Sequence, residues 1–372
     1  MNLMTSYYVM IPYTLLILNI LVVVHEFGHF WVARRCGVRT PEFSVGFGPL
    51  LWKTVKNGVQ YSIRAVPLGG FVKIEGMDIA LEGDGKGGET TENLPPNETF
   101  AALPLWKKLA IIIAGPFNNL ILAFLSLILI TVCIGIPYRY VDNRAKIGGV
   151  EFKSPAYESG LKTGDVVVAI NRKHVKTWED LARIVNASPK KSLLFTVQRN
   201  GQSFDLSIKP FYDPHYKIGR IGISPPLLFK RIPLKEAIVK GSQYGVDSFR
   251  EVIYALGRLI VGKERATGVG PIGMVGMMKQ AAESSLFQFF FIFPMLNLFL
   301  GIFNLLPIPL PLLDGGWVSI LILEKLRRKE FSAEQKAMAQ MIGMGLMIFL
   351  FVLITYGDIA SQIKYSLHLR GK

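Results

Sequence analysis

The chain has 372 residues, of which 50% are hydrophobic and 19% charged, with a net charge of +15 and a mean hydropathy of +0.35. This composition is too apolar for an ordinary soluble protein, and the two cysteines, Cys36 and Cys133, provide no disulfide framework. The positive charge by itself permits nucleic-acid binding, but no basic-aromatic module accompanies it, so we expect no nucleic-acid partner.

Four charge-poor runs are long enough to cross a hydrocarbon core, which needs about 20 apolar residues. These runs are residues 7–24, 109–136, 286–323 and 337–357. We therefore predict a membrane α-helical protein with about four transmembrane helices. We assign the helices to residues 1–30, 105–137, 286–327 and 337–360, followed by a tail at 361–372.

The third apolar run is too long for one simple span and contains a single charge, Asp314. Pro307, Pro309 and Pro311 precede this residue, and proline interrupts a helix because it lacks the backbone N–H and clashes with the preceding turn. We therefore expect a broken third span with a Pro-rich loop.

Basic residues predict the orientation, since cytoplasmic loops collect Lys and Arg. Basic clusters follow the first and third spans and precede the second, so residues 31–108 are expected in the cytoplasm and 137–285 outside. We predict a multi-pass membrane protein with this orientation.

Residues 31–104 are predicted to form a membrane-associated β-hairpin region and a flexible loop. Residues 41–75 are rich in β-branched and aromatic residues, and Asn57-Gly58 is a turn signal that predicts a hairpin between Trp52 and Val66. The Gly-rich stretch at 82–99 is expected to be the loop.

Residues 147–210 predict a compact α/β unit that runs strand, short helix, strand, helix and hairpin, with Asn200-Gly201 at the hairpin tip. The stretch "SPAYESGLKTGD" resembles a PDZ domain of the bacterial kind, which we place at 143–211. Ile147, Gly148 and Gly149 are the predicted ligand loop. Residues 212–285 are expected to form an amphipathic helical linker.

The strongest chemical pattern is "HEFGH", directly after the first apolar run. His25 and His29 are four residues apart, so a helix places both imidazoles on one face, where they can bind one Zn²⁺. Glu26 lies beside the pair and is positioned to exchange a proton with water. The alternative is a polar helix end near the interface, but an ionisable group at membrane depth indicates a functional site.

Catalytic zinc takes three protein ligands. Asp314 is the only charged residue between Glu283 and Glu324, and we expect it in the same half of the bilayer as His29. Cys36 and Cys133 stay open as thiolate ligands, and a polar helix cap is the alternative role for Asp314. The remaining histidines fall in other regions: His174, His215 and His368.

The motifs "HEFGH", "AGPFNN" and "NLFLGIFNLLPIPLPLLDGG", with the PDZ-like insertion between spans two and three, resemble the site-2 protease family of intramembrane zinc metalloproteases. The bacterial regulator-of-sigma-E protease type is the most similar, and "EFSVGFGP" and "VPLGGFVKIEGM" extend the resemblance over nearly the whole chain. The resemblance implies a location in the bacterial inner membrane, with the active site toward the cytoplasm and the PDZ-like domain outside it. It also implies one Zn²⁺ per chain. It assigns the metal ligands to His25, His29 and Asp314, the catalytic acid/base to Glu26, and a hold on the substrate backbone to Asn304.

Three features depart from the family pattern. Asn304 and Asp314 stand further apart, as if a Leu-Pro pair were inserted, and Trp317 replaces a frequent His. This chain also has one PDZ-like unit, whereas some members have two.

The predicted function is cleavage of a transmembrane segment of a single-span protein, such as an anti-sigma factor or a signal-peptide remnant. The substrate is expected to arrive shortened by another protease. A helix in lipid is a poor substrate, because its carbonyls are hydrogen-bonded and water is excluded. Residues 59–75 can hold an unwound segment by strand addition or form a self-contained hairpin on the membrane face. Substrate contacts are assigned to Asn304, Asn297, Gly69, Gly70 and Phe71.

The PDZ-like unit can bind a peptide terminus, filter substrates by size, or act as a structural lid. Asn118 and Asn119 are polar in an apolar span, and we favour helix–helix hydrogen bonding over substrate contact for them. Two other functions remain open: a zincin-type membrane protease with a glutamate as third ligand, and a non-catalytic PDZ adaptor or chaperone.

Overall fold

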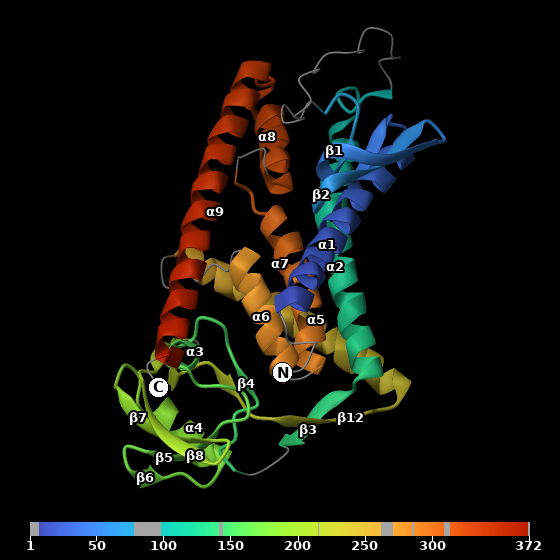
Figure 1. Ribbon diagram of the computed structural model, residues 1–372. Helices are drawn as coiled ribbons and strands as arrows, with labels where there is room; N and C mark the ends of the chain where they lie inside the picture. The colour runs from blue at the N-terminus through green and yellow to red at the C-terminus, as the bar shows by residue number, and fades with distance from the viewer. Residues whose placement is uncertain are drawn as a thin grey trace.

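The computed structural model describes residues 7–77, 98–140, 144–214, 216–261, 271–284, 286–308 and 313–370 (Figure 1). In the described residues, four helices are long and apolar enough to cross a membrane. They are Val9–Arg35, Leu105–Cys133, Leu286–Asn304 and Glu334–Ala360. The structure thus confirms the predicted membrane protein in one respect: it has four candidate spans, together with β-strands.

Helices α1 (Tyr7–Arg35), α2 (Leu105–Cys133) and α7 (Leu286–Asn304) pack together, with α2 against both of the others. Small residues permit the close approach. A Cβ atom on Gly301 of α7 would lie 2.9 Å from the carbonyl oxygen of Pro116 in α2. Without a hydrophobic force between helices in lipid, such close packing is a main source of association.

The apolar run at 286–323 forms two helices with a break at its prolines, and the first of the two is the third candidate span. Helix α7 ends at Asn304 and α8 (Asp314–Arg327) begins ten positions further on, and residues 305–308 and 313 between them are not helical. Pro307 cannot donate the backbone hydrogen bond that would continue α7. Pro309 and Pro311 lie outside the described residues.

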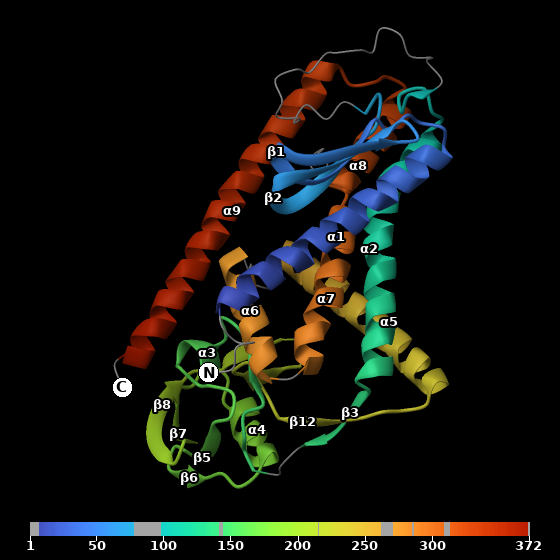
Figure 2. The same cartoon turned by 45° about the vertical axis from the view of Figure 1, so that its right-hand side comes forward.

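Strands β1 (Glu42–Lys56) and β2 (Val59–Lys73) form the hairpin that the Asn57-Gly58 pair predicted. Asn57 has φ 53° and Gly58 φ 75°, and a two-residue turn of this hand matches the twist of the paired strands. The hairpin lies beside α1 in Figures 1 and 2. Of the loop expected at 82–99, residues 82–97 lie outside the described residues.

A β-rich unit, defined here as residues 136–230, follows α2. Its main sheet has the strand order β6-β5-β7-β8 and packs against helix α4 (Trp178–Asn186), with Phe195 and Val197 fully buried between them. The four strands of this sheet are β5 (Val166–Ile170), β6 (Lys173–His174), β7 (Leu193–Arg199) and β8 (Gln202–Ile208). Shorter elements precede them: β3 (Ile136–Tyr140), β4 (Gly149–Val150) and α3 (Pro155–Glu158).

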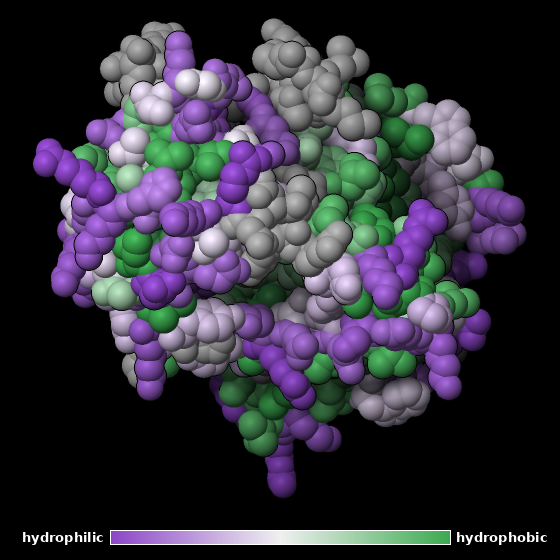
Figure 3. Space-filling model, turned by 90° about the horizontal axis from the view of Figure 1, so that it is seen from below, coloured by the Kyte–Doolittle hydropathy of each residue, from purple (hydrophilic) through white to green (hydrophobic). Residues whose placement is uncertain are grey.

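The expected helical linker at 212–285 is wrong in its first part, which belongs to the β-rich unit. This part forms β9 (Phe211–Asp213), β10 (Ile218–Arg220), β11 (Ile223–Ser224) and β12 (Leu227–Lys230). Strand β11 pairs with β4 and β12 pairs with β3, so strands distant in sequence supply the hydrogen bonds. Seen from the end of the molecule that carries the β-rich unit, the surface is rich in hydrophilic side chains, as suits contact with water (Figure 3).

The second part of that segment is helical, as α5 (Leu234–Ile260) and α6 (Pro271–Ser284). Helix α9 (Ala333–Arg370) starts earlier than expected and continues through the predicted tail, since no Gly or Pro interrupts it after Gly357. Asp358 of α9 is fully buried and contacts both the β-rich unit and α6. Its carboxylate pairs with Lys153 Nζ of the β-rich unit at 2.7 Å and accepts from Gly273 N of α6 at 2.7 Å.

Candidate metal centre

Helix α1 presents both histidines of the "HEFGH" motif on one face. His25 and His29 are each 7% exposed, and their Nε2 atoms lie 3.2 Å apart. The helical rise explains this arrangement, because residues four apart sit one turn above each other. The predicted pairing of the two rings is therefore present in the geometry.

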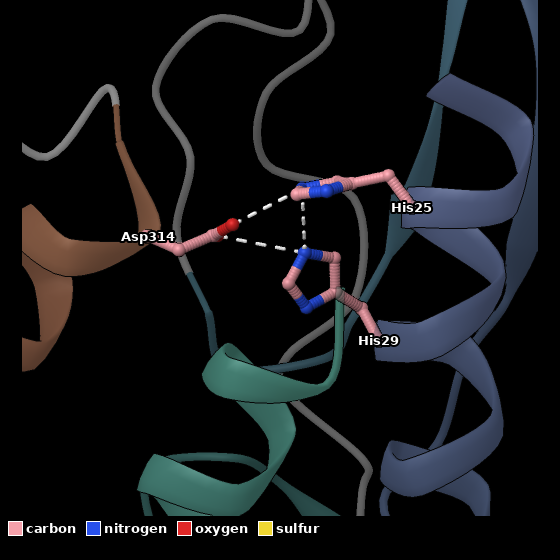
Figure 4. Close-up of side chains that lie close together, drawn as sticks. All are labelled: His25, His29 and Asp314. Atoms are coloured by element: carbon pink, nitrogen blue, oxygen red, sulfur yellow. Dashed lines mark hydrogen bonds and ion pairs between the residues drawn. The ribbon is translucent and has the colours of Figure 1, made fainter. Parts of the chain in front are cut away.

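Asp314, the first residue of α8, completes the cluster from a distant part of the chain (Figure 4). Its Oδ2 atom lies 3.0 Å from His25 Nε2, and its Oδ1 atom lies 3.5 Å from His29 Nε2. One ligand atom from each residue fits within 4.8 Å of the others. The break after α7 brings this carboxylate to α1, since a continuous helix would have carried it elsewhere.

The hydrogen bonding of His29 indicates what the cluster is suited to hold. His29 Nδ1 lies 2.9 Å from the carbonyl oxygen of Ile111 in α2. That oxygen can only accept, so Nδ1 carries the hydrogen and a neutral ring offers its Nε2 lone pair to the cluster. A carbonyl partner of this kind is usual behind a metal-binding histidine.

The ligand atoms therefore converge as two imidazole nitrogens and a carboxylate. Asp314 Oδ2 and His25 Nδ1 are buried without a hydrogen-bond partner among the described residues. Lone pairs that face one another at these distances repel unless a proton or a metal ion lies between them, and buried polar atoms without partners are costly. Two nitrogens and one carboxylate oxygen match a catalytic zinc site with one position left open.

Glu26 extends from the same turn of α1 toward strand β2. Its Oε2 atom accepts a hydrogen bond of 3.2 Å from the backbone N–H of Val72. The Val72 N–H is therefore directed at α1 rather than at β1. The carboxylate is thus fixed beside the two histidines.

The strand segment around Val72 lies at an edge of the hairpin. Residues 42–45 of β1 have partners on both sides, in 60–63 and in 70–73. Segment 70–73 is therefore outermost in this arrangement, next to Glu26. Gly69 and Gly70 pack tightly there: a Cβ on Gly70 would lie 2.5 Å from the carbonyl oxygen of Ser44. Phe71 stacks on Phe47 with ring centroids 6.2 Å apart.

The two asparagines assigned to substrate differ in their surroundings. Asn304 Nδ2 lies 3.5 Å from His25 Nε2, so this residue borders the cluster. Asn297 has no exposed surface, and its Nδ2 atom donates to Phe293 O of its own helix at 3.0 Å. The structure thus brings Asn304, but not Asn297, to the border of the cluster.

The predicted ligand loop of the β-rich unit already uses its donors. Ile147 N donates to Asp165 O, and Gly148 N donates to Ser224 O, each at 2.8 Å. Gly149 belongs to β4 and pairs with Ser224. The N–H groups of Ile147 and Gly148 are therefore occupied by contacts within the protein.

The alternative thiolate ligands stand apart from the cluster. Cys36 follows the last residue of α1, and Cys133 is the exposed last residue of α2. In the described part of the chain, the acidic residue that meets both histidines is Asp314, not the glutamate expected for the zincin alternative. His174 is exposed in β6, and His215 lies outside the described residues.

Sequence reasoning missed the backbone groups and small residues around the cluster. The carbonyl of Ile111 and the N–H of Val72 have no sequence signal, since every residue except proline carries both groups. Gly28 and Gly115 did carry a signal, because each is a glycine inside a helix next to a chemical motif. A Cβ on Gly115 would overlap the His29 ring, and one on Gly28 would overlap the carbonyl of Ala114.

Membrane-length helices and a buried cluster of metal-binding atoms together define a membrane-embedded metalloenzyme. The sequence profile of Peptidase family M50 matches residues 13–350. The chain therefore belongs to Peptidase family M50, the site-2 protease family that the motifs predicted.

Named relatives match over nearly their whole lengths. Regulator of sigma-W protease RasP of Bacillus subtilis is 28% identical over 93% of this chain and 97% of its own length. Zinc metalloprotease RasP of Geobacillus kaustophilus is 28% identical over 93% of this chain and 96% of its own. Metalloprotease MmpA of Caulobacter vibrioides is 28% identical, with 96% of each chain covered. The protein is accordingly a zinc metalloprotease, and its spans and bacterial relatives support an inner-membrane location.

Proposed function

We propose that this protein is an intramembrane endopeptidase in which His25, His29 and Asp314 hold one Zn²⁺ and Glu26 is the catalytic acid/base. The observation that carries the proposal is the convergence of these three metal-binding groups within 4.8 Å. Two of them come from α1, a candidate membrane span, and the third comes from α8, the helix that follows the break after α7. Ionisable groups inside a membrane are costly, so three of them at one point call for a function.

When bound, zinc supplies a Lewis acid that polarises the scissile carbonyl and lowers the pKa of a water molecule. Glu26 removes the proton from the attacking water and then delivers it to the leaving amine. Its position suits this role, because it directly follows His25 on α1 and the Val72 N–H holds its Oε2 atom. Asn304 borders His25 and is available to donate to the substrate backbone.

A transmembrane substrate must unwind before its carbonyls are accessible. We propose that the unwound segment adds as a strand to residues 70–73, the outermost segment of the β1–β2 hairpin. Strand addition uses backbone hydrogen bonds and therefore accepts many sequences. Gly69 and Gly70 have no side chains to obstruct the start of this edge, and Phe71 contributes an apolar surface.

The active site is proposed to face the cytoplasmic side. The Arg35 end of α1, the Leu105 end of α2 and the Arg327 end of α8 lie together at one end of the molecule, opposite the β-rich unit (Figures 1 and 2). These ends carry the basic residues that collect in the cytoplasm. The β-rich unit would then be extracytoplasmic.

We propose that the β-rich unit is PDZ-like and screens substrates there, either by binding a peptide terminus or by excluding large outer domains. The substrate class is a single-span membrane protein already shortened by another protease, such as an anti-sigma factor or a signal-peptide remnant.

The test is reconstitution of the purified protein in lipid vesicles with a single-span model substrate. We expect products whose new termini, identified by mass spectrometry, fall inside the transmembrane segment. Cleavage confined to the water-exposed flanks would contradict the intramembrane assignment and favour a protease that acts at the aqueous boundary. A matched substrate whose transmembrane segment is poly-leucine should be cut poorly, because it unwinds with more difficulty.

A further inference from the structure

One face of α2 lies directly against the turn of α1 that carries the "HEFGH" motif. Ile111, Gly115 and Asn118 are spaced at i, i+4 and i+7, so they form a single stripe along α2. Ile111 and Gly115 meet His29, and Asn118 meets Val24, the residue directly before the motif. The stripe follows the motif in the antiparallel sense, with Asn118 at the beginning and Ile111 at the end.

The contacts of this stripe are specific. The carbonyl of Ile111 accepts from His29 Nδ1 at 2.9 Å. Gly28 packs so closely on α2 that a Cβ would overlap the Ala114 carbonyl. Asn118 Nδ2 donates to the carbonyl of Val24 at 3.1 Å. The two hydrogen bonds thus bracket the motif, with a close glycine contact between them.

The Asn118 bond acts on the backbone immediately before His25. In a helix the Val24 carbonyl accepts from the N–H four residues later, and its second lone pair can take a side-chain donor. A second donor on this carbonyl resists rotation and sliding of α1 against α2. Hydrogen bonds of this kind between membrane helices are individually modest but directional.

The two histidines are supported differently. His29 has its own hydrogen bond to α2, whereas His25 Nδ1 has no partner among the described residues. The direction of the His25 ring therefore depends on the placement of its backbone as well as on its Nε2 contacts with Asp314 and His29. The placement of the backbone likewise sets where Glu26, the next residue along the chain, meets the Val72 N–H.

We infer that Asn118 is a positioning residue for the metal centre: by holding the Val24 carbonyl, it directs His25 toward Asp314 and Glu26 toward the reacting atoms. This inference rests on the proposed function of the cluster. The neighbouring Asn119 differs, since it is fully buried and its side chain has no hydrogen-bond partner among the described residues. Of the two asparagines in "AGPFNN", Asn118 is thus the one joined to the motif.

The experiment compares the full chain in detergent as wild type, Asn118→Ala and Asn118→Gln. Gln keeps an amide donor on a longer side chain. Thr131→Val is the matched control, because Thr131 is a buried residue of α2 whose hydroxyl donates to Leu127 of its own helix at 2.8 Å. Four quantities are measured: the rate of zinc release to a chelator, the visible spectrum of the Co²⁺-loaded protein, kcat and KM, and thermal unfolding without metal.

For Asn118→Ala we expect zinc release about tenfold faster and kcat about tenfold lower, the scale of losing a supporting residue at a metal site. The Co²⁺ spectrum should change because it reports ligand geometry, while KM and metal-free unfolding stay near wild type. Asn118→Gln should recover part of the loss, and Thr131→Val should match wild type throughout.

Two outcomes would overturn different statements. If Asn118→Ala lowers the unfolding temperature but keeps the wild-type zinc release and Co²⁺ spectrum, Asn118 only joins helices and the inference is wrong. If Asp314→Ala binds zinc as wild type does, the proposed metal site itself is wrong. If Asn118→Ala does not fold, Asn118→Gln provides the test. A Gln variant with half or less of the wild-type kcat but a wild-type Co²⁺ spectrum would contradict the inference, because the loss of rate would then not come from the geometry of the metal ligands.

Discussion

Asp314 Oδ2 lies 3.0 Å from His25 Nε2, although the two residues come from opposite ends of the chain. The contact joins α8 to α1, which is a candidate membrane span. Both groups are largely buried, so the pair needs either a shared cation or a shared proton. Asp314, the proposed third ligand, is therefore the first residue of the site to test.

Replacing Asp314 with alanine should abolish stable zinc binding. Removal of a direct ligand should cost at least as much as removal of a supporting residue, about 100-fold or more in metal affinity. Zinc content of the purified protein, measured by atomic spectroscopy, checks this. His174→Ala is the control, since His174 is exposed in the β-rich unit and should leave the zinc content unchanged. Full zinc in Asp314→Ala would require another third ligand.

Replacing Glu26 with glutamine should separate binding from catalysis. The amide keeps the size of the side chain but cannot accept a proton, so peptide cleavage should fall about 100-fold or more. Zinc content should stay at the wild-type level. The exposed Glu236 of α5 provides the control, and Glu236→Gln should retain activity. Full proteolytic activity in Glu26→Gln would remove this residue from the mechanism and revive the non-catalytic adaptor.

Replacing Gly28 with alanine should destabilise the protein and weaken the metal site. The new Cβ would overlap the Ala114 carbonyl, and overpacking of this kind costs about 1–3 kcal/mol. Denaturant titration in detergent measures the free energy of unfolding. Gly345→Ala in α9 is the matched control, because a Cβ there meets no atom within 4 Å among the described residues. That variant should gain about 0.5–1 kcal/mol from its helix propensity. Equal effects from both substitutions would contradict the packing argument.

Replacing Asp358 with asparagine should loosen the contact between the β-rich unit and α9. The substitution leaves the Lys153 ammonium without this carboxylate, and breaking a buried ion pair costs about 3–5 kcal/mol. Unfolding in detergent, together with protease accessibility of the β-rich unit, tests this.

Adding Lys153→Met to Asp358→Asn should recover much of that loss, since replacing both charges of a buried pair is nearly neutral. For comparison, Arg183→Ala removes an exposed pair with Asp180 and should cost under about 1 kcal/mol. A double variant no more stable than Asp358→Asn alone would show that the charge on Lys153 is not the cause.

Local signals in the sequence were sufficient for much of the architecture. The four spans follow from runs of apolar residues, because a hydrocarbon core demands them whatever the neighbours are. The Asn57-Gly58 turn follows from the positive φ angles that these residues tolerate. The pairing of His25 and His29 follows from the helical repeat alone. Each of these properties depends on residues close together in the chain.

Contacts between distant segments were decided by the tertiary structure. Asp314 was one of several candidate third ligands until the break after Asn304 carried it to α1. The strands at 223–224 and 227–230 form because β4 and β3 provide partners, and no local pattern encodes a distant partner. The supports of the site are backbone groups, the Ile111 carbonyl and the Val72 N–H. Backbone groups are chemically alike at nearly every position, so only their location in the folded chain distinguishes them.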